Sequence, residues 1–126
     1  MLNKLVRDKI PQDMESHGQV VHSRVLGDEE YLQELARKAV EEAREFNLAD
    51  AEGAPKELAD LLTIVMAGCA ALGMTFEELQ ALEAKCTAER GGFSERIYVE
   101  RLDLQGDDNW VDYYAADPTK FPEIKE

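Results

Sequence analysis

Cysteine and histidine are scarce in this 126-residue chain, which has two of each. The two cysteines, Cys69 and Cys86, lie in helical patterns and suggest neither a disulfide framework nor a zinc site. The N-terminus lacks the apolar stretch of a secretory signal. The longest apolar run, residues 61–72, is interrupted by Thr63 and is too short to span a bilayer. We therefore expect a cytoplasmic protein with no membrane partner.

Basic residues are also few, since 14 lysines and arginines face 27 acids and give a formal net charge of −13. A surface this acidic repels DNA, RNA and anionic membranes, so binding to a nucleic acid polymer is disfavoured. A small phosphorylated ligand is not excluded, because divalent cations can lie between two negative partners. The length fits one domain, and a hydrophobic content of 44% is normal for a globular protein.

The first strong helical pattern covers residues 29–46, with Asp28 as the expected N-cap. Its apolar residues follow a helical stripe. They are Leu32, Leu35, Ala39 and Phe46. Position 42 would complete this stripe but holds a glutamate, and an unpaired carboxylate on an apolar face is costly.

A second helix is predicted over residues 54–72, with Pro55 in its first turn and Gly73 after its end. After Asp60 it is apolar nearly all round. A helix of this kind belongs in the middle of a bundle or in a dimer interface. We therefore expect a homo-oligomer, most simply a dimer.

A third helix is predicted from the Thr75/Glu78 capping box to Arg90. Residues 20–26 and 97–104 have the β-branched or weakly alternating character of short strands or extended arms. The predicted fold class is thus all-α: an antiparallel helical bundle, completed by dimerisation, with short extended segments flanking the helices.

The chain divides by composition into a helical domain, residues 1–104, and an acidic tail, residues 105–126. The tail contains Trp110, Tyr113 and Tyr114 among acidic residues, and we expect no regular core element in it.

Two pairs of carboxylates are the most informative feature. Glu42 and Glu45 are three positions apart on the first helix, and Glu57 and Asp60 have the same spacing on the second. Residues three apart on a helix are neighbours on one face. Because the linker, positions 46–56, is short, the helices can form an antiparallel hairpin in which the two pairs face each other.

The pattern leaves two interpretations open. In one, these are solvated helix faces, where Lys38 pairs with Glu42 or Glu45 and Lys56 pairs with Asp60. In the other, the acids hold a metal, because buried carboxylates near one another need a cation.

Oxygen ligands with no histidine or cysteine nearby suit Mg²⁺ or Mn²⁺. A di-iron site of the ferritin type would need a Glu-x-x-His motif, and neither His17 nor His22 has that setting.

The order Glu41-Glu42-x-x-Glu45 followed by Glu57-x-x-Asp60 resembles the signature of the MazG-like all-α nucleoside triphosphate pyrophosphohydrolases. This superfamily includes phosphoribosyl-ATP pyrophosphohydrolases and dimeric dUTPases.

Two flanking motifs, Lys4-Leu-Val-Arg-Asp-Lys-Ile-Pro11 and the segment from Lys85 to Arg90-Gly-Gly-Phe93, look like the phosphoribosyl-ATP pyrophosphohydrolase-like branch. The resemblance covers about residues 3–102 and leaves out the tail.

The resemblance implies a role for each matching residue. The implied metal ligands are Glu42, Glu45, Glu57 and Asp60. Glu41 is an accessory acid, and Glu41 or Glu42 is the implied catalytic base. The implied phosphate-binding residues are Lys85 and Arg90, with Lys4, Arg7 and Lys9 as further candidates. Taken alone, Arg7 and Lys9 could equally pair with surface acids.

The implied activity is Mg²⁺-dependent hydrolysis of a nucleotide polyphosphate, with Mn²⁺ as an alternative metal. Water attacks between the α- and β-phosphates and releases pyrophosphate and a monophosphate. Phosphoribosyl-ATP, dUTP and damaged nucleotides are all open as substrates, and a housecleaning role is favoured. The alternative is a non-catalytic helical module that binds a nucleotide or a protein.

Overall fold

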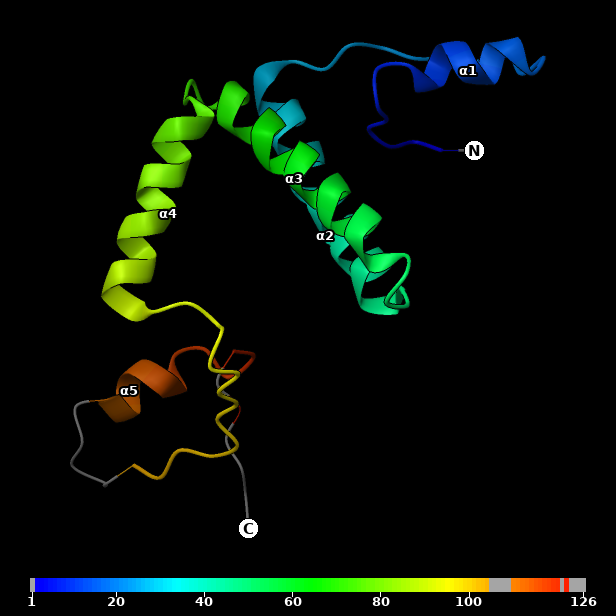
Figure 1. The fold of residues 1–126 in the computed structure, drawn as a ribbon. Coiled ribbons are helices and arrows are strands. Elements are labelled where there is room, and N and C mark those ends of the chain that lie inside the picture. The colour runs from blue at the N-terminus through cyan, green and yellow to red at the C-terminus, as the bar shows by residue number, and fades with distance from the viewer. Residues whose placement is uncertain (1, 105–109, 121, 123–126) are drawn as a thin grey trace. The chain divides into compact units, whose positions relative to one another are not determined.

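The computed structural model describes residues 2–104, 110–120 and 122, and over these residues the chain has helices and no strand (Figure 1). The helices are α1 (Ile10–Ser16), α2 (Asp28–Leu48), α3 (Ala54–Ala71), α4 (Phe76–Arg90) and α5 (Trp110–Ala115). The predicted all-α character is confirmed. The chain forms two compact units, Met1–Glu89 and Arg90–Glu126. The predicted division after residue 104 follows composition and stays a prediction.

A hairpin of α2 and α3 makes the core of the first unit, and it is the one pair of described helices that pack together. The five-residue connection is ordered by Asp50, whose Oδ1 accepts a hydrogen bond from the Gly53 N–H at 2.8 Å. Among the described residues, the buried apolar side chains are Leu35 of α2 and Cys69 of α3. Cys69 is a free thiol, as expected of a reduced cysteine.

The start of α2 differs from the prediction. Gly27 is the N-cap and Asp28 is the first helical residue, and no side chain caps the helix. Asp28, Glu29 and Glu30 instead fill the first turn, where carboxylates interact favourably with the helix dipole. The Asp28 prediction was therefore wrong by one position, because any of several acids at this point satisfies the same electrostatic preference.

The end of α3 is set by Gly73, as predicted. Gly73 has a φ of 72°, in the left-handed region that favours glycine. Its N–H donates to the Ala70 carbonyl at 3.1 Å, and the Met74 N–H donates to the Cys69 carbonyl at 2.9 Å. These two bonds form a Schellman motif, which satisfies carbonyls that the helix end would leave unpaired.

Both ends of α4 also follow the sequence signals. The Glu78 N–H donates to Thr75 Oγ1 at 3.1 Å, which is the N-cap half of the predicted capping box. Gly91 follows Arg90 with a φ of 83° and ends the helix.

One side of α3 remains uncovered within the single chain. Four apolar side chains form what we call the α3 stripe, and each is 43–52% exposed. They are Leu58, Leu62, Val65 and Met66. The predicted burial of α3 on every side is therefore not achieved by α2 alone.

The flanking segments 20–26 and 97–104 do not pair as strands in this chain, so the strand alternative is not realised. In the second unit, the six-residue α5 lies where no regular core element was predicted, and it buries none of its residues. Its Trp110 and Tyr113 rings pack edge to face with centroids 5.4 Å apart. Within the described residues, no single helix combines the length and apolar character needed to cross a bilayer.

Candidate metal site between two helices

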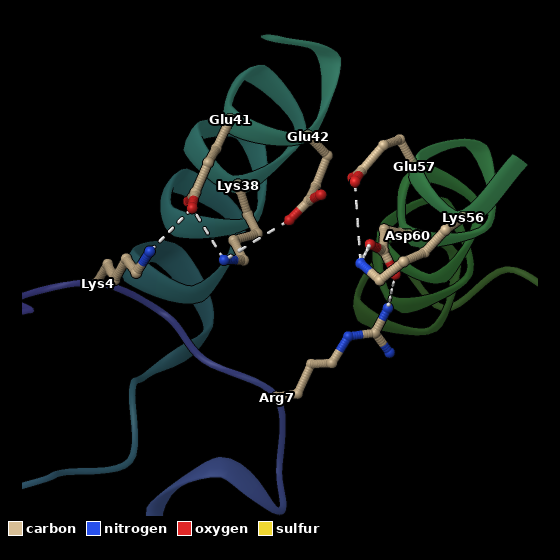
Figure 2. A network of polar contacts seen from close by, with 8 residues as sticks. All are labelled: Lys4, Arg7, Lys38, Glu41, Glu42, Lys56, Glu57 and Asp60. Atoms are coloured by element: carbon tan, nitrogen blue, oxygen red, sulfur yellow. Dashed lines mark hydrogen bonds and ion pairs between the residues drawn. The ribbon is translucent and has the colours of Figure 1, made fainter. Parts of the chain in front are cut away.

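Three carboxylates from α2 and α3 come together across the hairpin (Figure 2). Glu42 lies on α2, and Glu57 and Asp60 lie on α3. One oxygen atom from each lies within 4.8 Å of the other two. The side chains are 13%, 18% and 17% exposed, respectively, so all three are largely shielded but open to solvent on one side. We call them the acid triad.

Local helix geometry explains the convergence. Glu57 and Asp60 are three positions apart, so both project from the same face of α3. Glu57 also lies in the first turn of α3, where the helix dipole favours a carboxylate. Glu42 occupies the glutamate position of the α2 apolar stripe, and that stripe faces α3. The predicted facing of Glu42 toward Glu57 and Asp60 is seen, while their role as metal ligands stays a prediction.

Basic side chains surround the triad and pair with it. Asp60 Oδ1 accepts a hydrogen bond from Arg7 Nη2 at 2.7 Å, and Asp60 Oδ2 accepts one from Lys56 Nζ at 2.9 Å. Lys56 Nζ also lies 3.9 Å from Glu57 Oε1, and Lys38 Nζ lies 3.8 Å from Glu42 Oε1. The ion pairs expected for solvated helix faces are thus present for Lys38 with Glu42 and for Lys56 with Asp60.

Glu41 lies beside the triad and is held by two lysines. Its Oε1 accepts a hydrogen bond from Lys4 Nζ at 2.9 Å, and its Oε2 accepts one from Lys38 Nζ at 3.2 Å. These hydrogen bonds, that from Lys4 first, lower the pKa of Glu41. Glu41 is therefore a stable anion next to the triad.

Neighbouring carboxyls of the triad have opposite pKa shifts. Removal from water, followed by repulsion from Asp60, raises the pKa of Glu42. The hydrogen bond from Lys56 is the main cause that lowers the pKa of Asp60, against a smaller opposing effect of burial. The negative charge is therefore held firmly at Asp60 and less firmly at Glu42.

The other residues predicted at the site are placed differently. Glu45 is exposed and lies outside the triad. Lys9 is exposed and is the N-cap of α1. Lys85 lies on α4, which does not pack on α2 or α3, so the structure does not bring it to the triad. Arg90 ends α4 and belongs to the second unit, and its proposed phosphate contact stays a prediction.

The contacts that sequence reasoning left unspecified are those of the N-terminal segment. Lys4 and Arg7 reach acids 37 and 53 positions away. No periodicity in the sequence encodes such distant pairs. The only available signal was the basic character of the segment itself.

The donor set fits a hard divalent cation. The triad offers carboxylate oxygens alone, and Mg²⁺ is bound in proteins by one or two carboxylates with several waters and substrate phosphates. The open side of the triad leaves room for those waters. A magnesium–oxygen distance of about 2.1 Å requires the three carboxylates to draw closer than their metal-free positions, which flexible glutamate side chains allow.

Comparison with known proteins found no match among protein-family models, curated proteins or solved structures. The resemblance to the MazG-like pyrophosphohydrolases accordingly remains a prediction from the motifs.

Proposed function

We propose that this chain is a Mg²⁺-dependent nucleotide pyrophosphohydrolase of the MazG-like type. The observation that supports the proposal is the acid triad of Glu42, Glu57 and Asp60, formed by the two helices that carry the acid signature. Three shielded carboxylates at one point are expensive for a protein unless cations balance them. A site that binds a divalent cation makes use of that cost.

In the proposed reaction, the triad holds the metal and Glu41 orients a water molecule through a hydrogen bond. Bound Mg²⁺ supplies charge neutralisation for the polyphosphate and acidifies water, which favours attack between the α- and β-phosphates. Lys4 and Arg7 flank the acids and are 42% and 54% exposed, which supports their proposed role in binding phosphate. The products are pyrophosphate and a monophosphate.

We also propose that a second copy of the chain covers the α3 stripe. Apart from its first residues, α3 is uncharged, so two copies can bring these faces together without placing like charges in contact. This arrangement completes an antiparallel bundle from two hairpins. It also overcomes the repulsion expected between two chains of net charge −13, because the contact is apolar.

One observation favours the second candidate, a non-catalytic helical module. The triad and Glu41 carry four acids, and they are paired with four basic side chains: Lys4, Arg7, Lys38 and Lys56. This pairing balances the charge without a metal. A binding module needs nothing more from these residues.

A pyrophosphate-release assay separates the two candidates. Phosphoribosyl-ATP, dUTP and a set of non-standard nucleotides are incubated with the protein, with and without Mg²⁺. The enzyme should release pyrophosphate from at least one of them only with Mg²⁺, and Glu57→Gln should reduce the rate at least about 100-fold. Glu52→Gln, an exposed acid in the connection between α2 and α3, is the control and should keep the rate. No release from any nucleotide would favour the binding module.

A further inference from the structure

The N-terminal segment, residues 2–9, is attached to the hairpin by two charged contacts to different helices (Figure 2). Lys4 pairs with Glu41 of α2, and Arg7 pairs with Asp60 of α3. The segment therefore bridges the two helices at the edge of the acid triad.

Arg7 occupies an oxygen that the proposed metal needs. Both oxygens of Asp60 are engaged, Oδ1 by Arg7 and Oδ2 by Lys56. Lys56 is a neighbour on the same helix turn and stays close in any arrangement of the chain. Arg7 comes from a segment with no helical connection to α3, so it is the partner that can leave.

A guanidinium and a divalent cation on the same carboxylate repel each other. Two positive centres a few ångströms apart interact unfavourably even when solvent screens them partly. Arg7 is half-exposed, and exposed ion pairs are weak. A divalent cation can therefore displace Arg7 at modest cost.

We infer that the N-terminal segment is a latch that closes over the triad in the metal-free protein and opens when a divalent cation binds. The inference rests on the proposed metal-binding role of the triad. Metal binding breaks the Arg7–Asp60 pair and frees the guanidinium, which is then available to a phosphate group of the substrate. Because the two equilibria are linked, anything that holds the latch closed lowers metal affinity by the same factor.

The first test compares Mg²⁺ affinity, measured by calorimetric titration with the metal alone, in the wild type and in Arg7→Ala. The variant should bind Mg²⁺ about two- to fivefold more tightly, which is the size of effect that loss of an exposed ion pair gives. Arg24→Ala is the matched control, because it removes the same charge from an exposed arginine that pairs with Glu30 away from the triad. Equal affinities in Arg7→Ala and Arg24→Ala would overturn the latch.

The second test measures backbone motion of residues 2–9 by ¹⁵N relaxation in the wild type. Addition of Mg²⁺ should lower the order parameters of this segment. Unchanged order with saturating Mg²⁺ would also overturn the latch.

The two proposals fail in different ways. Mg²⁺ that binds the wild type, is lost in Asp60→Asn and is unaffected by Arg7→Ala would remove the latch and leave the metal site. A wild type that does not bind Mg²⁺ would remove both.

Discussion

Lys4 and Glu41 are 37 positions apart in the sequence, yet Lys4 Nζ donates a hydrogen bond to Glu41 Oε1 at 2.9 Å. The side chains are 42% and 36% exposed, so water and salt screen their attraction. Their shared charge raises the pKa of Lys4 and lowers that of Glu41. The contact therefore positions the N-terminal segment more than it stabilises the fold.

A double-mutant cycle on this pair should give a small coupling energy. We expect Lys4→Ala and Glu41→Ala to be coupled by about 0.2–1 kcal/mol in the free energy of unfolding, measured with urea at low salt. The coupling should shrink in 1 M NaCl. A coupling of several kcal/mol would contradict the exposed, screened geometry.

Metal binding should depend on the triad and not on acidity in general. Glu57→Gln combined with Asp60→Asn should weaken Mg²⁺ or Mn²⁺ binding at least about tenfold, because two of three oxygen donors are lost. Asp28→Asn with Glu29→Gln is the control, since it neutralises two acids in the first turn of α2 instead of α3. Equal weakening in both double variants would point to non-specific attraction by the net charge.

Neutralising Glu42 should stabilise the metal-free protein. The folded state raises the pKa of Glu42 because its carboxyl is largely shielded from water and lies near Asp60, so the charged form costs stability at pH 7. Glu42→Gln removes that cost and should raise the melting temperature in chelator by about 2 °C. Glu45→Gln, one turn further along α2 and outside the triad, should change it less.

The advantage of Glu42→Gln should disappear at low pH. As the pH falls through the raised folded-state pKa of Glu42, the wild type takes up a proton and loses the same penalty. Asp60 has the opposite sign: its lowered pKa stabilises the fold at neutral pH, and this contribution is lost in both proteins as the pH falls below about 3.8. A melting-temperature gap that stays constant from pH 7 to pH 4 would contradict the assignment.

The α3 stripe predicts an interface. Sedimentation of the full chain should show a dimer at micromolar concentration, and Leu62→Glu should shift it to monomer, because a charge buried at an apolar contact is costly. Val25→Glu is the control, since Val25 is 98% exposed and lies outside the helices. A wild-type chain that sediments as a monomer would remove the dimer proposal, and truncation after Leu104 shows whether the tail contributes.

Two glycines near the end of α3 should respond to alanine with opposite signs. Gly73→Ala should cost about 1–2 kcal/mol in the free energy of unfolding, because its φ of 72° strains any residue with a Cβ. Gly68→Ala lies inside the helix with open space around the added Cβ and should stabilise by about 0.5–1 kcal/mol. Both values come from urea denaturation. Equal effects would show that neither helix geometry nor backbone strain decides them.

The sequence by itself determined the features that depend on neighbouring residues. Pro55 and Gly73 mark the ends of α3, and Thr75 begins α4, because backbone geometry and capping are local. The shared face of Glu57 and Asp60 follows from a helical repeat of 3.6 residues per turn. Only the N-cap of α2 was misplaced, where Asp28, Glu29 and Glu30 offer equivalent electrostatic solutions.

The tertiary structure alone decided which distant groups meet. The packing of α2 on α3 brings Glu42 to Glu57 and Asp60 and leaves Glu45 in solvent, although both glutamates belong to the same sequence motif. It also decided that Arg7 pairs with Asp60, 53 positions away. Such contacts depend on how the helices pack and where the chain crosses them, and a periodic pattern along one helix contains no information about either.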